Sequence, residues 1–214
     1  MVQDEYRFCW PGRLAKKSFS RCASWLSLFA LLLFLPFRAS AHTETGAIGG
    51  FVSGFQHPLT GLDHIVAMVA VGLWGAFLGA PAMWILPVVF PVVMALGGAL
   101  GVLGVPIPAV ETGIALSGVL LGLMVAFAAR PPLKLAAVIV GFFAIFHGHA
   151  HGTELPSAAN PITYAMGFVI STGLLHLSGI AFGLLVRWPW GKVIVRSGGA
   201  AIAAVGLAFL FRLL

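Results

Sequence analysis

The residues of this sequence best suited to bind a metal ion lie in two short segments. The first contains His57, Asp63 and His64, and Met68 follows His64 by four residues. In a helix, His64 and Met68 share one face. The Asp63 carboxylate either ligates a cation or holds an imidazole in the tautomer that binds one. The alternative explanation for Asp63 is that an acid near a helix N-terminus interacts favourably with the helix dipole.

The second segment holds three histidines at alternate positions and one acid within eight residues: His147, His149, His151 and Glu154. If this segment is helical, His147 and His151 share a face and His149 points away; if it is extended, all three align. The alternative is an exposed polar loop. Imidazole and carboxylate without thiolate suit divalent ions such as Ni²⁺, Co²⁺ or Zn²⁺. The two segments together therefore predict a divalent-metal site.

Three further candidates lie outside these segments. Glu111 begins a predicted helix, where a helix-dipole role is the alternative. His176 lies well inside an apolar stretch, where a buried histidine is more often part of a structural hydrogen bond than a ligand. Phe90 lies between Pro87 and Pro91, and each proline frees a backbone carbonyl. Broken helices of this kind often line a substrate route in membranes, although a simple kink is the alternative.

The composition indicates that these residues are positioned by membrane helices. The chain has 214 residues, of which 60% are hydrophobic and only 8% are charged, against roughly 25% charged residues in soluble domains. A soluble enzyme or a nucleic-acid-binding protein is therefore excluded. Six of the twelve Lys and Arg residues lie within residues 1–41, so the net charge of +6 does not describe a nucleic-acid-binding surface.

Residues 1–41 are typical of a cleavable signal peptide. Basic residues up to Arg21 precede an apolar run at 23–36, and the small residues of 39–41 (ASA) follow, as at a signal cleavage site. An uncleaved first membrane helix is the alternative. Cleavage would make His42 the new N-terminus, and its amine and imidazole could then join the metal site. Both cysteines lie in this segment, so the mature chain would contain no thiolate.

The remaining residues, 42–214, are predicted to form an all-α domain of six transmembrane helices. No Asp, Glu, Lys or Arg occurs between Asp63 and Glu111, a gap long enough for two spans of about 20 residues. Residues 46–55 are too short to cross and predict a half-helix packed against the first span. Glycines spaced by four recur along the chain and indicate close helix packing. The six predicted spans are 60–79, 82–102, 110–129, 133–149, 161–186 and 193–213.

The distribution of Lys and Arg orients these spans. Five of the basic residues after position 42 fall in the loops at 130–134 and 187–196, and the loops at 103–109 and 150–160 contain none. Because basic loops stay in the cytoplasm, both metal-binding segments and Glu111 are predicted to face the periplasm, like the mature N-terminus. This places the protein in the inner membrane of a bacterium.

The HPLTGLDH segment followed by Met68 and the FHGHAHGTE segment together resemble the HupE/UreJ family of bacterial membrane proteins, over essentially all of 42–214. The resemblance implies a nickel permease, in some members linked to cobalt, that serves hydrogenase or urease maturation. It implies six helices after signal removal, and the metal is cargo rather than a prosthetic group. The residues that match the family pattern are His57, Asp63, His64, Phe90, Glu111, His147, His149, His151 and Glu154.

We therefore expect a transporter that binds a divalent cation within the lipid bilayer. Two alternatives stay open: a membrane metal sensor or chaperone without transport, and a histidine-rich membrane metalloenzyme. The enzyme alternative lacks an HExxH motif, and the sequence contains no ATP-binding motif. The choice between Ni²⁺ and Co²⁺, the coupling ion and the oligomeric state are left open by the sequence.

Overall fold

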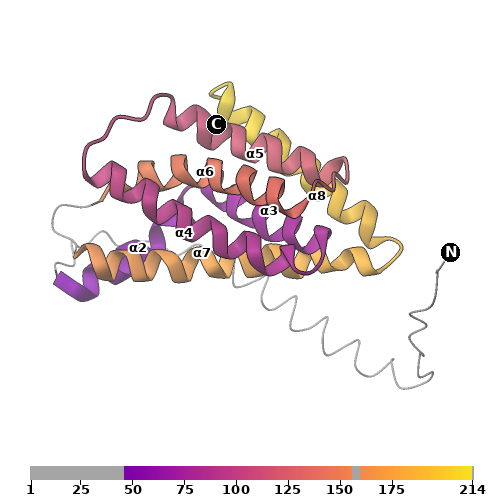
Figure 1. Cartoon of the computed structure of the whole chain (residues 1–214), viewed down its shortest axis with the longest axis horizontal. Coiled ribbons are helices and arrows are strands. Elements are labelled where there is room, and N and C mark those ends of the chain that lie inside the picture. The colour runs from indigo at the N-terminus through magenta and orange to yellow at the C-terminus, as the bar shows by residue number, and fades with distance from the viewer. Residues whose placement is uncertain (1–45, 156–159, 214) are drawn as a thin grey trace, which may run out of the picture. The chain divides into compact units, whose positions relative to one another are not determined.

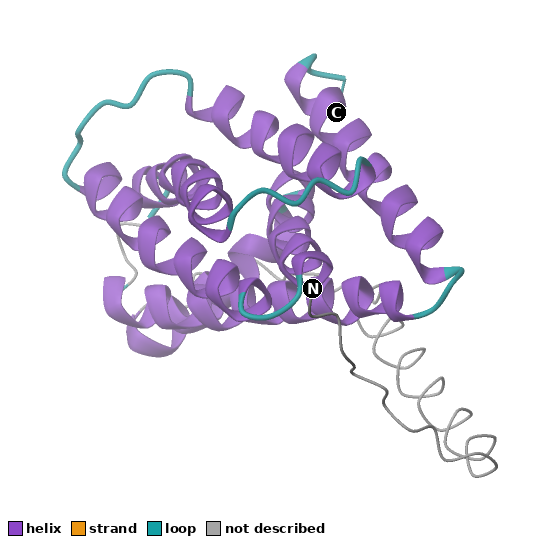
Figure 2. Ribbon diagram, turned by 45° about the vertical axis from the view of Figure 1, so that its right-hand side comes forward, coloured by secondary structure: helices purple, strands orange, loops and turns teal. Residues whose placement is uncertain are grey.

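The computed structural model describes residues 46–155 and 160–213. The predicted signal peptide, its cleavage site and His42 lie outside the described residues. Within the described ranges all regular elements are helices (Figure 1, Figure 2). In chain order they are α2 (Gly46–Thr60), α3 (Leu62–Leu78), α4 (Ala82–Val102), α5 (Val110–Ala126), α6 (Leu133–Thr153), α7 (Pro161–Gly183), the 3-10 helix η1 (Leu184–Arg187) and α8 (Gly191–Leu210).

Several of these helices are long and apolar enough to cross a membrane. In the described residues, four helices pass this test by themselves: α4, α6, α7 extended by η1, and α8. The helices α2 and α3 pass together, but an 83° bend separates them. The shorter α5 is also apolar, and its 17 residues extend about 25 Å at 1.5 Å per residue. The all-helical prediction is thus confirmed with four or five candidate spans, and the count of six stays a prediction.

The outward surface of these helices is apolar, as lipid requires. On α4, the exposed side chains Trp84, Val88, Val92 and Leu96 recur every four residues. Leu86, Phe90 and Met94, also four residues apart on this helix, are buried. A soluble protein rarely exposes a continuous apolar stripe of this kind. The chain is therefore a multi-pass membrane protein.

Two helix boundaries differ from the predicted ones in ways that matter for the site. The fourth predicted span ends at residue 149, but α6 continues to Thr153, so the whole second histidine segment is helical. The predicted half-helix at 46–55 continues to Thr60 and packs mainly against α7 rather than against the first span. Gly50 and Gly54 make this contact, because a Cβ on either would overlap Thr163 or Tyr164 of α7.

Glycines allow three pairs of helices to pack at backbone distance. A Cβ on Gly148 of α6 would overlap the Met94 carbonyl of α4. Similar contacts join Gly72 of α3 to the His176 carbonyl of α7, and Gly122 of α5 to Ala203 of α8. Residues without a Cβ permit such close approach in lipid. The glycine spacing therefore indicated packing correctly.

The central helix of the described part is α3. From Ala67 to Phe77 all of its residues except Val69 are buried, and it contacts α2, α4, α5, α7 and α8. It ends at Gly79, whose φ of +86° favours glycine. The start of α3, with Asp63 and His64, is only half-buried.

Candidate metal centre

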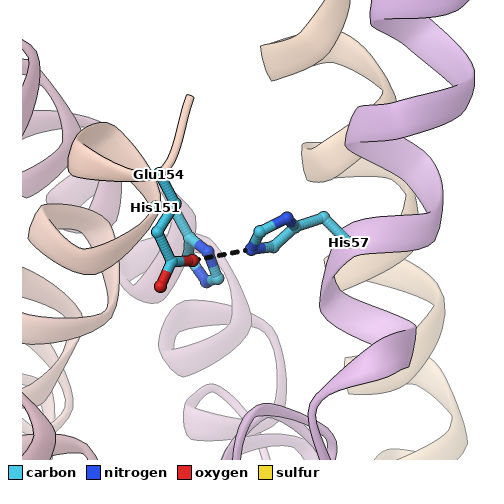
Figure 3. A group of neighbouring side chains, drawn as sticks. All are labelled: His57, His151 and Glu154. Atoms are coloured by element: carbon cyan, nitrogen blue, oxygen red, sulfur yellow. Dashed lines mark hydrogen bonds and ion pairs between the residues drawn. The ribbon is translucent and has the colours of Figure 1, made fainter. Parts of the chain in front are cut away.

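Three ligand groups from two helix ends meet at one point of the structure (Figure 3). His57 lies in the last turn of α2, His151 in the last turn of α6, and Glu154 directly after α6. One ligand atom from each residue lies within 4.8 Å of the others, and His57 Nε2 is 3.1 Å from Glu154 Oε2. Two imidazoles and a carboxylate at this spacing are a donor set that could hold a divalent transition metal.

Asp63 and His64 form a second pair beside this group. The His64 ring donates from Nδ1 to Asp63 Oδ1 at 2.8 Å, and the His64 backbone N–H donates to the same oxygen at 2.9 Å. Because an ionised carboxylate only accepts, Nδ1 carries the ring proton and Nε2 keeps its lone pair. This Nε2 is buried and has no hydrogen-bond partner. Asp63 therefore fixes the metal-binding tautomer of His64.

The bend between α2 and α3 makes this pair possible. Gly61 joins the two helices in an extended conformation, with φ −97° and ψ 118°. A Cβ on Gly61 would lie 2.7 Å from Asp63 Oδ1 and 2.8 Å from His64 Nδ1. Any other residue at this position would force the carboxylate and the imidazole to move. The glycine is thus needed to place Asp63 and His64 together.

The imidazole rings of the two segments form a continuous group. The ring of His151 lies 4.8 Å from that of His57 and 4.5 Å from that of His64, centroid to centroid. The ring of His147 lies 5.4 Å from that of His64. We call His57, His64, His147 and His151, with Asp63 and Glu154, the histidine cluster. It joins α2, α3 and α6, as the grouping of the two segments predicted.

The histidine cluster runs from an exposed edge to a buried end. The Glu154 side chain is 54% exposed and that of His57 26%, whereas His151 is buried and His147 is fully enclosed. His147 Nδ1 donates to the Phe143 carbonyl at 3.0 Å, which leaves Nε2 as the free lone pair. This Nε2 and both ring nitrogens of His151 are buried without a hydrogen-bond partner.

These unpaired nitrogens fit a metal ion as their missing partner. A buried polar atom without a hydrogen bond is unfavourable by about 1–3 kcal/mol, and native proteins contain few of them. Here four such nitrogens lie on three adjacent rings: His64, His147 and His151. A divalent cation accepts lone pairs from all of these rings, so the donor set fits metal binding.

Two predicted ligands lie elsewhere. His149 points away from the cluster, as the helical alternative requires, and its Nε2 lies 2.7 Å from the Val105 carbonyl. Glu111 is exposed in the first turn of α5 and belongs to no group of metal-ligating side chains in the described residues. Met68 is fully buried one turn after His64, within the hydrophobic core.

Aromatic residues border the cluster, and sequence reasoning identified only one of them. Phe90 contacts the His147 ring edge-on at 5.4 Å. Phe168 of α7 lies 4.3 Å from the His151 ring, and Tyr164 lies 6.0 Å from the His57 ring. Tyr164, Phe168 and His176 recur at multiples of four residues on α7, which is the signal that could have identified the first two.

A cavity of about 210 Å³ lies between α4, α6 and α7. His151 and Tyr164 are the polar side chains among its described lining residues, and the other walls are apolar or glycine. The space is large enough for several water molecules. His151 thus borders an open, mainly apolar space between these three helices.

Comparison with known proteins identifies relatives of the whole membrane domain. The family model described as HupE / UreJ protein matches residues 30–209. Protein HupE of Rhizobium leguminosarum bv. viciae is 48% identical over 178 residues, which cover 83% of this chain and 93% of that protein. No solved structure matches the chain.

Proposed function

The chain belongs to the HupE/UreJ family, and from this membership and the site we propose that it is a permease for divalent nickel. It imports Ni²⁺, or Co²⁺, from the periplasm to the cytoplasm for the maturation of a metalloenzyme such as hydrogenase or urease. The observation that carries the proposal is the histidine cluster, in which four buried imidazole nitrogens have no hydrogen-bond partner. The metal is the cargo, and no prosthetic group takes part.

The proposed orientation places the histidine cluster at the periplasmic side of the bacterial inner membrane. The basic residues gather at the opposite ends of the helices: Arg196 Nε donates to the Ala126 carbonyl at the end of α5. Arg130 lies 5.0 Å over the Phe77 ring near the end of α3. Basic residues mark the cytoplasmic side, so His57 and Glu154 face outward. A cleaved signal peptide puts the mature N-terminus on the same side.

Six crossings agree with how the helices pack. The glycine contacts show that α4 and α6 run parallel, whereas α5 and α8 run antiparallel. Both orientations are required if α3 to α8 cross the membrane one after another in alternating directions. In this arrangement α5 is the third of the six crossings, although its 17 residues make it as short as α3, and α2 is a half-helix on the periplasmic side.

The cluster is suited to transport because its ligands follow one another from the surface to the interior and do not enclose a single ion position. A structural site surrounds its ion with four fixed ligands, whereas here the rings continue from exposed His57 to fully buried His147. Sites that bind moderately and in succession let an ion enter and leave. The chain carries no ATP-binding motif, so we propose that the membrane potential drives the inward movement.

Uptake of labelled nickel by cells that lack their own nickel importers tests this function. Cells that express the protein should accumulate Ni²⁺, and Asp63→Ala or His64→Ala should reduce uptake at least tenfold at matched membrane levels. Ser178→Ala is the control, because its hydroxyl bonds only to the Leu175 carbonyl of its own helix. If the purified protein binds Ni²⁺ but cells that express it show no uptake, the permease function is contradicted and a sensor or chaperone is favoured.

A further inference from the structure

A line of buried side chains continues along α7 beyond the histidine cluster. Tyr164, Phe168, Thr172 and His176 follow one another at intervals of four residues, so they share one face of the helix. All four are buried. The first two contact rings of the histidine cluster, whereas His176 is eight residues further along, about 12 Å at 1.5 Å per residue.

His176 is enclosed, and the polar group that lies near its ring is the Pro87 carbonyl of α4. It is 1% exposed, and neither ring nitrogen has a partner within hydrogen-bond geometry. The Thr172 hydroxyl, one turn earlier, is also buried and unpaired. In contrast, the hydroxyls of Ser117 and Ser178 bond to carbonyls of their own helices, the usual solution for a hydroxyl in an apolar helix. The Thr172 hydroxyl and at least one ring nitrogen of His176 are therefore available to a ligand.

Phe90 contacts both His176 and the histidine cluster. Its ring is fully buried and lies 5.4 Å from the ring of His147 and 5.4 Å from that of His176, near perpendicular to the latter. One phenyl ring thus lies against two imidazoles, each of which has an unpaired nitrogen.

The α4 helix supplies an oxygen ligand beside His176. Pro91 has no N–H, so the Pro87 carbonyl lacks its usual helical donor, and this carbonyl lies near the His176 ring. An imidazole nitrogen, a hydroxyl and a backbone carbonyl are all neutral donors. Such a set suits a divalent cation of the nickel or cobalt kind, but holds it more weakly than a set that contains a carboxylate.

We propose that His176 and Thr172, with the Pro87 carbonyl, form an inner binding site for the divalent cation, next to the Phe90 ring that also contacts the histidine cluster. The inference rests on the proposed transport function, because it supplies the next position on the inward route. The outer cluster holds two carboxylates and captures the ion. The inner site holds none, so it binds the ion briefly and releases it toward the cytoplasm.

Equilibrium binding of NiCl₂ to purified protein in lipid nanodiscs tests the inner site without any need for transport. His64→Ala/His151→Ala disables the outer cluster, and this variant should still bind one Ni²⁺ with reduced affinity. Adding His176→Leu should abolish that residual binding, and Thr172→Val should weaken it several-fold, whereas Ser178→Ala should leave it unchanged. Absence of residual binding, or residual binding that survives His176→Leu, would overturn the proposal.

Flux into proteoliposomes then separates the inner site from the function as a whole. His176→Leu alone should lower the maximal rate at least tenfold and change the half-saturating external Ni²⁺ less than threefold. It should also retain or raise the unfolding temperature, since it removes unpaired buried nitrogens; a purely structural histidine would give unchanged flux and overturn the proposal. If the wild type binds Ni²⁺ without flux, the transport function fails and the binding experiment alone decides the inner site. Should His176→Leu not fold, His176→Gln replaces it in both measurements.

Discussion

Replacement of Gly61 by alanine should weaken metal binding although Gly61 is not a ligand. The added Cβ would lie 2.7 Å from Asp63 Oδ1 and 2.8 Å from His64 Nδ1. Carbon and oxygen atoms need several tenths of an ångström more, and the flexible Asp63 side chain can move away more easily than the backbone. The backbone at Gly61, with φ −97° and ψ 118°, is accessible to alanine. The substitution therefore breaks the Asp63–His64 hydrogen bond and keeps the fold.

The size of this effect follows from what the hydrogen bond does. A carboxylate that orients a ligating histidine typically contributes 10–100-fold to metal affinity, which corresponds to about 1.4–2.8 kcal/mol. Stability should change less, because Gly→Ala at a compatible position gains about 0.4–1 kcal/mol. That gain partly offsets the loss of the charge-assisted bond.

Nickel binding to purified Gly61→Ala protein, measured by isothermal titration calorimetry, checks this prediction. Gly173→Ala is the matched control, since a Cβ there meets no atom within 4 Å. We expect a 10–100-fold higher dissociation constant for Gly61→Ala and an unchanged one for Gly173→Ala. A Gly61→Ala protein with wild-type affinity would show that the Asp63–His64 pair does not prepare the site.

Further outcomes follow from the same structure. Nickel uptake should fall as the external pH drops below the ordinary imidazole value of about 6.5, because protonated imidazole binds no metal and burial lowers the pKa of His57. Uptake that stays flat from about pH 8 down to about pH 4 would contradict an imidazole site. Gly148→Ala should destabilise the protein in detergent by about 1–3 kcal/mol, because its Cβ would overlap the Met94 carbonyl and lie 2.8 Å from Gly98 N; an unfolding temperature equal to that of Gly173→Ala would disprove close packing there. Mass spectrometry of the mature protein should find His42 at the N-terminus, and another first residue would remove the terminal chelate. Dissipation of the membrane potential should slow uptake, and an unchanged rate would exclude that driving force.

The sequence predicted the positions of the helices well, because charged side chains are so unfavourable in lipid that gaps between them mark the apolar helices. The gap between Asp63 and Glu111 located two spans, and the loop residues of 79–81 divided them close to where α3 ends and α4 begins. The helical length of α2 was underestimated: the predicted half-helix ended at residue 55, whereas α2 continues to Thr60 with Pro58 inside it. Which helices pair could not be read from the sequence, because glycine spacing shows that a face packs closely but not its partner.

The candidate site was predicted in part. The sequence grouped His57, Asp63, His64 and the histidines of the second segment, and the structure brings most of them together. The residues that lie outside the cluster do so because of how their helices are rotated. In the continuous helix α6, the two-residue spacing between His149 and His151 places their side chains on nearly opposite faces. The same geometry leaves Glu111 exposed on α5. Tyr164 and Phe168 were missed because an aromatic residue within an apolar span has the same sequence pattern whether it faces lipid or a metal site.

The tautomers of the cluster give one further reason to propose a cation as its ligand. His64 and His147 each donate from Nδ1, to a carboxylate and to a backbone carbonyl respectively, so both present a lone pair from Nε2. An anion would meet these lone pairs and the Asp63 carboxylate, and would be repelled. A neutral hydrogen-bond donor would satisfy one nitrogen at a time. A divalent cation, in contrast, can bind several lone pairs at once. The imidazole rings from His57 to His147 would provide it with successive ligands as it moves inward.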